Sequence, residues 1–312
     1  MTDIARLARN TGSEVIETHI SWLLLGEYVY KIKKPVKFSF LDFSTPEKRR
    51  FYCAEEVRLN SRLSPDVYIG VVGVGDSGFS EPEGAGEHAV KMRRLSEESK
   101  MDALLGRGKV AESDIRRLAE AIAGFHLKAE RTPGYGSASL VAEQAADLSS
   151  MREAIEKASG LGRWVDKLLS RSAIFLRRNR ELMEGRRKEF VRDCHGDLHS
   201  QNVFFQDGIK IIDCIEFSRD FRCIDVASDL AFMAMDLDYA GRDDLSGLLV
   251  ERYLELTGDA GLEALLPFYK CYRANVRAKI AAIEWTQKPT HLSRERIDRY
   301  VLLAEKYSKT LS

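Results

Sequence analysis

The sequence predicts an α+β fold in two parts, a small strand-rich part followed by a larger and mostly helical one. Two observations support this prediction. The first ninety or so residues contain short apolar runs rich in β-branched and aromatic residues, separated by turn residues, as is typical of strands. From Arg94 onward, apolar residues recur mainly at helical spacing. We therefore expect one domain over residues 1–94 and a second over residues 95–312.

The first part contains the signals of a hairpin, a helix and two further strands. Thr45 followed by Pro46 is a typical helix start, and Ser64-Pro65 is a typical stop. Gly73, Gly75 and Gly78 match Gly-x-Gly-x-x-Gly, but no helix follows them, so we do not interpret them as a dinucleotide fingerprint. The expected elements are strands 20–25 and 28–33, a helix from Thr45 to about Leu63, and strands 67–74 and 89–92 around a loose hairpin loop over 73–86.

The second part reads as a series of helices interrupted by one hairpin. Ile115, Leu118, Ile122 and Phe125 share a face of a helix that we expect to begin at Ser113 as its cap. The expected helices are 113–128, two or three between 141 and 187, and then 225–235, 245–256, 262–285 and 294–309.

A polar loop and a β-hairpin over residues 194–217 contain groups that can handle a metal ion and a proton. Asp207-Gly208 is a strong turn signal between two short apolar runs. Asp197 and Asn202 stand in the loop before the first run, and Asp213 follows the second. A loop ahead of one strand lies near the end of its antiparallel partner, so we expect these three side chains to converge.

Carboxylate and amide oxygens are the ligands that Mg²⁺ prefers, together with water and phosphate oxygens. In kinases, a catalytic-loop Asp accepts the hydroxyl proton of the substrate. An Asn a few residues on and an Asp after the next hairpin hold the metal ions. His195-Gly-Asp197, Asn202 and Asp213 follow this order. The pattern therefore predicts phosphoryl transfer.

Two other interpretations of this loop were weighed. Asp197, Asn202 and Asp213 are residues that also form turns and caps, although these rarely recur in this order and spacing. Cys194, His195 and His199 are residue types that bind zinc, and the two histidines are four apart as on a metalloprotease helix. Gly196 stands directly after the first histidine, however, and no Glu is adjacent. We prefer a role for His195 in orienting the loop by hydrogen bonding.

The motif resembles that of the aminoglycoside phosphotransferase-like small-molecule kinases, a group that includes choline and fructosamine kinases. Val-Tyr-Lys-Ile-Lys-Lys-Pro over residues 29–35 is similar to an uncharacterised bacterial branch of this family. The resemblance covers nearly the whole chain. It implies a bilobal protein-kinase-like fold, with a strand-rich N-lobe, a helical C-lobe that carries the catalytic hairpin 194–217, and ATP in the cleft between them.

The same resemblance implies the cofactors and the roles of the site residues. ATP and Mg²⁺ are the expected cofactors. Asp197 is the expected catalytic base or acceptor-orienting group, and Asn202 and Asp213 are the expected metal ligands. Asp225 and Asp229 are expected to brace the catalytic loop through hydrogen bonds to its backbone.

A kinase of this class also needs a strand lysine for the nucleotide phosphates and a helix glutamate that fixes it. Lys31 and Lys33 share one face of the expected strand because strand side chains alternate. We prefer Lys31, which stands further from Pro35, although both could also be solvated strand lysines. Glu55 and Glu56 are the candidates on the helix, and we prefer Glu55.

The acceptor side is less defined by the sequence. Glu216 could join the metal shell, face the acceptor or lie at the surface. Arg273 and Arg277 share a helix face, where they either pair with acidic residues or line a pocket for an anionic acceptor. Four aspartates near Gly241 could attract a polycationic acceptor, but a loop rich in Asp is more often a solvated turn. They are Asp236, Asp238, Asp243 and Asp244.

Composition argues against several classes of protein. Lys plus Arg and Asp plus Glu number 48 each among 312 residues, so we expect no bulk electrostatic binding to nucleic acid or to a membrane. Five cysteines without paired spacing indicate reduced thiols. The start of the chain does not read as a signal peptide, and no apolar run reaches about 20 residues. We expect a cytoplasmic protein.

The sequence therefore predicts an ATP- and Mg²⁺-dependent phosphotransferase that phosphorylates a hydroxyl of a small molecule, such as a sugar, an amino sugar or an aminoglycoside-like compound. A regulatory pseudokinase that binds nucleotide without transfer is one alternative. A kinase or nucleotidyl transferase that acts on protein is another. The complete Asp197, Asn202 and Asp213 set argues against the pseudokinase.

Overall fold

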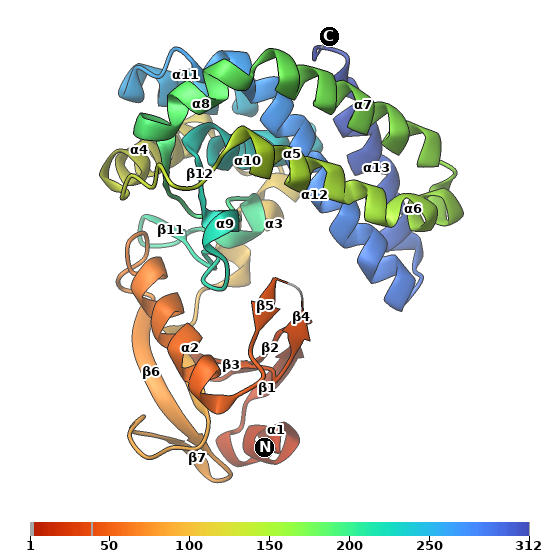
Figure 1. Ribbon diagram of the computed structural model, residues 1–312. Helices are drawn as coiled ribbons and strands as arrows, with labels where there is room; N and C mark the ends of the chain where they lie inside the picture. The colour runs from red at the N-terminus through yellow and green to blue at the C-terminus, as the bar shows by residue number, and fades with distance from the viewer. Residues whose placement is uncertain (1–2, 39, 312) are drawn as a thin grey trace. The chain divides into compact units, whose positions relative to one another are not determined.

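The structure is a computed structural model that describes residues 3–38 and 40–311. The chain divides into two compact units (Figure 1). The first contains Met1–Gly108 and Gln201–Arg222, and the second contains Lys109–Ser200 and Cys223–Ser312. This grouping differs from the expected division at residue 94, because residues 201–222 of the hairpin group with the strands. The assignment of ATP binding to one part and of catalysis to the other stays a prediction.

The first unit is built on a six-stranded antiparallel sheet with the strand order β1-β2-β3-β8-β6-β7. The expected hairpin is confirmed in β2 and β3, which pair from Ser21 opposite Lys33 to Leu25 opposite Val29. The strands are β1 Glu14–Glu17, β2 Ser21–Leu25, β3 Tyr28–Lys33, β6 Tyr68–Gly75, β7 Gly78–Ser80 and β8 His88–Arg93, with a separate small pair, β4 Lys37–Phe38 and β5 Leu41–Asp42.

The expected hairpin loop over 73–86 is more regular than predicted. The segment was expected to be loose, but β6 continues to Gly75 and β7 pairs back onto it. The reason is the two-residue turn at Asp76 and Ser77, which keeps the strands in register from Gly73 opposite Ser80. The glycines of the Gly-x-Gly-x-x-Gly pattern therefore belong to a β-hairpin, as their lack of a following helix indicated.

The two faces of the sheet carry different helices. Helix α1 (Ile4–Thr11) covers one face, where Leu7 packs with Leu24 and Ile32. Helix α2 (Pro46–Asn60) covers the other, where its Cys53 packs with Val90. Its N-cap is Thr45, whose side chain accepts a hydrogen bond from the backbone of Lys48, as the sequence predicted. Neighbouring strand residues point to opposite faces, so the residues of β3 on either side of Ile32 face α2.

The hairpin that follows the catalytic loop is docked against the end of α2. Its strands are β10 (Val203–Phe205) and β11 (Ile209–Ile211), and the Asp207-Gly208 turn has positive φ at both residues, as the sequence predicted. Ser64 both donates to and accepts from the backbone of Ile211, at 2.9 Å each. The side chain of Asn60 accepts a hydrogen bond from the backbone N–H of Cys214 at 2.8 Å. The segment that carries Asp213 is thereby tied to α2.

The remaining elements of the first unit are η1 Glu97–Ser99, α3 Met101–Gly106, η3 Ser200–Asn202, which continues from the second unit, and α9 Arg219–Arg222.

The second unit is helical around α10, whose residues Val226–Leu237 are all buried. The individually predicted helices are present with small shifts at their ends, but four helices, α5 to α8, occupy the stretch where two or three were expected. One cap was wrong: the N-cap of α4 is Ala111 and not Ser113, and Asp114 accepts a hydrogen bond from the Ala111 N–H at 3.0 Å. The elements are α4 Glu112–Lys128, α5 Ala138–Ala146, η2 Asp147–Met151, α6 Arg152–Ser159, α7 Gly162–Arg178, α8 Arg180–Phe190, β9 Val191–Asp193, β12 Cys223–Asp225, α10 Val226–Tyr239, α11 Asp243–Thr257, α12 Leu262–Gln287 and α13 His291–Ser308.

A buried arginine ties three segments of the second unit together. Arg186 on α8 donates to both oxygens of Asp225, at 2.7 and 2.9 Å, and to both oxygens of Asp259, at 2.5 and 2.6 Å. Asp225 also accepts from the backbone N–H of Ala227 at 2.9 Å and so caps α10. The expectation that Asp225 is structural is confirmed, although its backbone partner lies in α10 and not in the catalytic loop.

Within the part of the chain that the structure describes, no helix has both the length and the apolar character needed to cross a membrane.

We expect Arg186→Leu to destabilise the second unit by about 3–5 kcal/mol, because two buried carboxylates would lose their cation. Thermal unfolding followed by circular dichroism measures the effect. Arg58→Leu is the matched control, because Arg58 pairs with Glu55 on an exposed part of α2. Equal midpoints for the two variants would contradict the role of Arg186.

Candidate active site

A cluster of two lysines and three carboxylates lies between the sheet, α2 and the segment after β11 in the first unit. Lys31 Nζ lies 2.8 Å from Glu56 Oε1 and 2.6 Å from Asp213 Oδ1. Lys33 Nζ lies 2.6 Å from Glu56 Oε2 and also contacts Glu216. Glu56 therefore bridges both lysines, one with each oxygen, and each lysine has a second carboxylate partner.

The predicted pairing of Lys31 with Glu55 was wrong in its acidic partner. Glu56 meets both lysines, whereas the carboxylate of Glu55 accepts two hydrogen bonds from Arg58, at 2.9 and 2.7 Å. The physical reason is the phase of the helix. Glu56 lies three residues after Cys53, which packs against the sheet, and its side chain is fully buried, whereas that of Glu55 is 24% exposed.

The two lysines differ in their burial. The side chain of Lys33 is 0% exposed, and that of Lys31 is 12% exposed. Lys33 is deeper because Glu216 covers its ammonium and because that ammonium lies 4.9 Å from the ring centre of Phe43, a cation–π contact. Lys31 keeps some access to solvent, which a phosphate-binding lysine needs. Its choice as the nucleotide lysine stays a prediction.

The charges of this cluster stabilise one another. Burial would raise the pKa of Glu56, but Lys31 and Lys33 lower it to about 2. Burial would lower the pKa of Lys31, but Asp213 and Glu56 raise it well above its usual value. Burial raises the pKa of Glu216 even though Lys33 contacts it. The cluster is therefore ionised at Glu56 and at Lys31 over the whole neutral range.

Asp213 and Asn202, the two predicted metal ligands, lie on adjoining segments of the first unit. The carbonyl of Asn202 accepts a hydrogen bond from the N–H of Ile212 at 2.9 Å. Asp213 has a left-handed backbone with φ of 64°, and its N–H donates to the hydroxyl of Tyr68 at 3.1 Å. Its side chain is 50% exposed. Asn202, in contrast, is buried at 8% exposed. Carboxylate and amide oxygens fit the chemistry of a magnesium site, and Asp213 is the accessible member of this pair.

The catalytic loop in the second unit is held by side chains from several helices. The two oxygens of Asp229 on α10 accept hydrogen bonds from the N–H groups of His195 and Gly196, at 2.9 Å each. Arg273 on α12 donates to the carbonyl of Gly196 at 3.0 Å. Asp236 accepts from the N–H of Ser200 at 2.8 Å. The expectation that Asp229 braces the loop backbone is confirmed.

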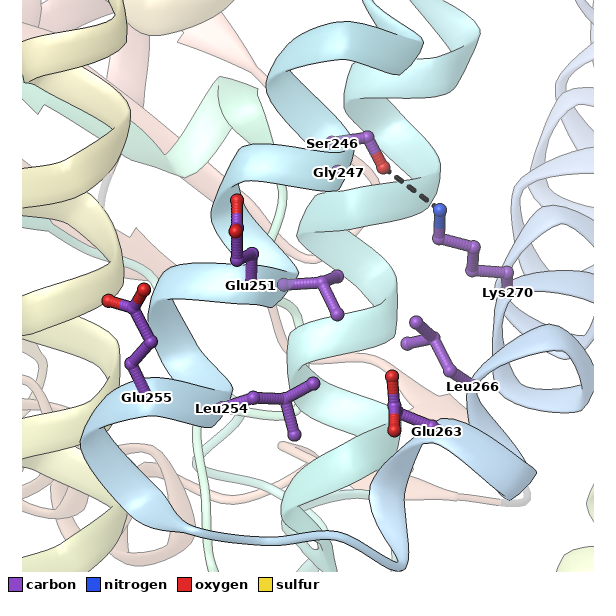
Figure 2. A pocket seen from close by; sticks show the side chains of 9 residues that line it. Ser246, Gly247, Glu251, Leu254, Glu255, Glu263, Leu266 and Lys270 are labelled. Carbon is purple, nitrogen blue, oxygen red and sulfur yellow. Dashed lines mark hydrogen bonds between the residues drawn. The ribbon is translucent and has the colours of Figure 1, made fainter.

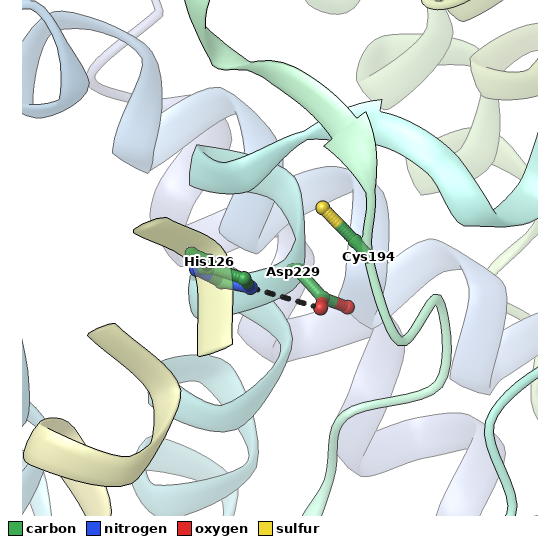
Figure 3. Close-up of side chains that lie close together, drawn as sticks. All are labelled: His126, Cys194 and Asp229. Atoms are coloured by element: carbon green, nitrogen blue, oxygen red, sulfur yellow. Dashed lines mark hydrogen bonds and ion pairs between the residues drawn. The ribbon is translucent and has the colours of Figure 1, made fainter. Parts of the chain in front are cut away.

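Figure 3 shows His126, Cys194 and Asp229 pointing toward one another from three elements of the second unit. Their nearest ligand atoms lie within 4.8 Å of one another, as in a metal site. These atoms already have protein partners, however. His126 Nε2 lies 3.1 Å from Asp229 Oδ2, His126 Nδ1 lies 2.9 Å from the hydroxyl of Tyr253, and the thiol of Cys194 donates to the carbonyl of Ile224 at 3.4 Å. We therefore interpret His126, Cys194 and Asp229 as a structural group that supports the catalytic loop.

Asp197, the predicted base, lies in the same loop. Its carboxylate is 3.3 Å from His199 Nε2, and its N–H donates to His195 Nδ1 at 3.2 Å. Burial would raise the pKa of Asp197, but His199, Arg277 and His195 hold it below its usual range. The suggested role of His195 in orienting the loop is thus supported. Asp197 belongs to the second unit and Asn202 and Asp213 to the first, so the convergence of all three stays a prediction.

The two arginines of the late helix α12 both contact the catalytic loop, and whether they also face an acceptor stays a prediction. Arg273 donates to two backbone carbonyls, of Gly196 and Ser228, and Arg277 contacts His199 and the hydroxyl of Tyr300. Asp236 and Asp238 are buried, so half of the acidic group that we expected to be a solvated turn serves the interior. Asp243 and Asp244 are exposed and pair with surface cations, as expected.

A shallow pocket of about 500 Å³ lies between α11 and α12 in the second unit (Figure 2). Apolar side chains, among them Leu254 and Leu266, form its walls, and three glutamates stand around it. Lys270 donates to Ser246 and to Asp238, at 2.9 Å each. The polar groups of its floor are therefore satisfied by the protein itself.

Sequence reasoning missed the residues that support the site from other elements. His126, Phe43 and Tyr68 each contact a site group, yet each stands in a segment without a catalytic motif. His126 carried one usable signal, because it is a histidine within a run of residues with helical periodicity, where a buried polar residue needs a partner.

Comparisons with known proteins find similar sequences along most of the chain. A family model described as a phosphotransferase enzyme family matches residues 53–268. The uncharacterized proteins Rv2004c of Mycobacterium tuberculosis and Mb2027c of Mycobacterium bovis are each 32% identical over 308 residues, which cover 94% of this chain and 59% of each relative. The chain thus spans about three fifths of the length of these relatives.

Solved structures show the same fold at low sequence identity. Choline kinase from Cryptosporidium parvum aligns with a TM-score of 0.55 at 13% identity, over 96% of this chain and 90% of that one. The GDP complex of aminoglycoside 2'-phosphotransferase-IIIa aligns with a TM-score of 0.54 at 14% identity, over 96% and 92%. Ethanolamine kinase from Plasmodium vivax aligns with a TM-score of 0.54 at 11% identity, over 95% and 81%. The predicted α+β, protein-kinase-like fold class is confirmed.

Replacement of Lys31 and of Lys33 should lower the free energy of unfolding by different amounts. We expect Lys33→Met to lower the free energy of unfolding by about 3 kcal/mol, because it leaves Glu216 and Glu56 buried with one cation fewer. Lys31→Met should cost less stability, because its ammonium is partly exposed and Asp213 can be solvated. Urea unfolding measures both. A larger loss for Lys31→Met would reverse the assignment of Lys33 as the structural lysine.

Glu56 should give the protein a defined acid sensitivity. Its pKa falls from an ordinary 4.5 to about 2 on folding, so its contribution to stability is complete above pH 4.5 and is lost as the pH falls toward 2. We expect the stability of Glu56→Gln to depend less on pH than that of the wild type in this window. Thermal midpoints measured from pH 2 to 6 provide the comparison, with Glu55→Gln as the control. Parallel curves for the wild type and Glu56→Gln would refute this.

Proposed function

Because the chain belongs to the phosphotransferase enzyme family, we propose that it transfers the terminal phosphoryl group of Mg²⁺-bound ATP to a hydroxyl group of a small molecule. Family membership supports phosphoryl transfer, and the hydroxyl acceptor is part of the proposal. The nucleotide, the metal and the small size of the acceptor are its other parts. The observation that carries them is the contact of Lys31 with both Glu56 and Asp213.

Lys31 has the place and the environment of a phosphate-binding lysine. Glu56 holds it from α2, so the ammonium keeps one position and meets a nucleotide with little loss of side-chain freedom. Asp213 stands 2.6 Å from it and would hold a metal ion beside the phosphates, together with Asn202. When bound, Mg²⁺ supplies neutralisation of the negative charge on the phosphates.

Asp197 would act on the acceptor. Its low pKa keeps the carboxylate ionised, so it accepts a hydrogen bond from the acceptor hydroxyl and orients the oxygen toward phosphorus. Asp197 and Asn202 are five residues apart, and one loop therefore connects the proposed acceptor-orienting group to the proposed metal ligands. The relatives of known function among the solved structures are named as kinases of choline and ethanolamine and as an aminoglycoside phosphotransferase, so small hydroxyl compounds are the proposed acceptor class.

We expect the purified protein to form ADP in the presence of Mg²⁺, ATP and one class of small hydroxyl compound. A library of sugars, amino sugars, amino alcohols and aminoglycosides would be screened for ADP release, with a parallel assay for AMP. Release of AMP would point to nucleotidyl transfer. Tight binding of Mg²⁺-ATP with no product from any acceptor would favour the pseudokinase alternative.

We expect Asp197→Asn to lower the rate of transfer by roughly 10²–10⁴-fold while nucleotide affinity is retained, because the amide no longer accepts the hydroxyl proton. Asp207→Asn is the matched control, since Asp207 lies in the hairpin turn with a positive φ that Asn tolerates. An unimpaired rate in Asp197→Asn would remove Asp197 from the mechanism.

We expect Asp213→Asn to weaken the binding of Mg²⁺-ATP far more than that of metal-free ATP, because a charged metal ligand is lost. Asn is chosen because it tolerates the left-handed backbone of this position better than Ala does. Isothermal titration calorimetry with and without Mg²⁺ makes the comparison. The idea fails if the two affinities change equally.

A further inference from the structure

His199 is a buried residue of the catalytic loop that the proposed function does not use. Its side chain is 5% exposed. Its Nε2 lies 3.3 Å from Asp197 Oδ2 and also 3.3 Å from Arg277 Nη1. Its other ring nitrogen, Nδ1, is buried and has no hydrogen-bond partner among the residues that the structure describes. One nitrogen therefore faces both a hydrogen-bond acceptor and a donor, and the other faces neither.

The position of the ring proton follows from this environment. A neutral imidazole carries one N–H and one lone pair. A proton on Nδ1 would be a buried donor without an acceptor, and the lone pair on Nε2 would then face the carboxylate of Asp197. A proton on Nε2 is donated to Asp197 and leaves a bare lone pair on Nδ1, the more readily tolerated of the two unsatisfied groups. In that tautomer Arg277 Nη1 no longer has His199 as an acceptor, while Arg277 Nε keeps the hydroxyl of Tyr300 as its partner at 3.2 Å.

A doubly protonated ring fits this environment less well. It would place a second cation 3.3 Å from Arg277 and would again leave an N–H on Nδ1 without an acceptor. The ring of Phe232 packs against the imidazole, with 5.2 Å between ring centres, and adds apolar surroundings that disfavour a charge. The other titratable or charged groups around this pair in the second unit are His195 in the loop, Asp236 on α10, and Arg277 and Tyr300 on α12 and α13.

We infer that His199 is a positioning residue for Asp197: its neutral Nε2–H tautomer holds one carboxylate oxygen and leaves the other to the acceptor hydroxyl. The role in transfer rests on the proposed function, whereas the tautomer and its hydrogen bond do not. A donor on one oxygen fixes the rotation of the carboxylate and stabilises its ionised form. The hydrogen bond from His199 and the charge of Arg277 both lower the pKa of Asp197, against the opposing effect of burial.

The tautomer can be measured without any enzymatic activity. The chain has six histidines, so ring nitrogen signals from a sample labelled with ¹⁵N-histidine are few, and the loss of one set in His199→Gln identifies His199. We expect the ring at pH 8 to carry its proton on Nε2 and none on Nδ1. A proton on Nδ1, or on both nitrogens, would overturn the inference.

The effect on Asp197 is measured by titrating its ¹³C-labelled carboxyl, which Asp197→Asn identifies. We expect the pKa of Asp197 to rise in His199→Leu, which lacks the donor. It should stay near the wild-type value in His199→Gln, whose side-chain amide can reach the place of Nε2. An unchanged pKa in His199→Leu would contradict the role. If His199→Leu fails to fold, the wild-type tautomer still decides.

Kinetics then connect the hydrogen bond to transfer. With an acceptor found in the screen, kcat should fall roughly 10- to 100-fold in His199→Leu, as for a lost hydrogen bond to a charged group, while KM for ATP changes little. His199→Gln should recover most of kcat, and His291→Leu, at the exposed start of α13, should have no effect. Equal losses in the Leu and Gln variants would refute the donor role. If the wild type forms no product, the proposed function fails, and the tautomer measurement still tests His199.

Discussion

The first unit depends on one buried carboxylate with two cations. Glu56 pairs with Lys31 through one oxygen and with Lys33 through the other, so α2 is connected to β3 at two successive inward positions. Charges in a protein interior are costly unless they are paired, and removal of one partner leaves the others exposed to that cost. The position of α2 over the sheet, and of the hairpin docked on its end, therefore follows from a balance of charges as much as from apolar packing.

This balance also prepares the cluster for a nucleotide. Two lysines and three carboxylates carry a net charge of −1 when all five are ionised. The excess negative charge lies toward Asp213, the member with the most exposed side chain. A divalent cation is therefore attracted to the accessible side of the cluster, while Lys31 remains available beside it for phosphate oxygens. Lys33 and Glu216 neutralise each other in the interior and hold the segment that carries Asp213.

The sequence predicted the elements and the chemistry well, and the supporting contacts poorly. The hairpin over 203–211 was found because its Asp-Gly turn and apolar strands are local signals. The choice between Glu55 and Glu56 was wrong because α2 has no clear apolar stripe: Arg49, Glu56 and Asn60 are polar and yet point inward. When a helix buries polar residues, the spacing of its apolar residues no longer indicates which face points inward. The burial of Lys33 depends on its contacts with Phe43 and Glu216. Neither contact can be inferred from the strand that carries Lys33.

The catalytic loop shows why such contacts matter for a phosphotransferase. Transfer of a phosphoryl group asks the protein mainly for positioning and charge, so the loop must keep one shape. Residues 194–199 form neither helix nor strand, and Gly196 has φ of 85°, which favours glycine. The backbone hydrogen bonds that regular structure would supply come instead from Asp229, Asp236 and Arg273, on two helices. These helices also form the core of the second unit, so the backbone of the loop that carries Asp197 is held by core residues 30 to 80 positions away in the sequence.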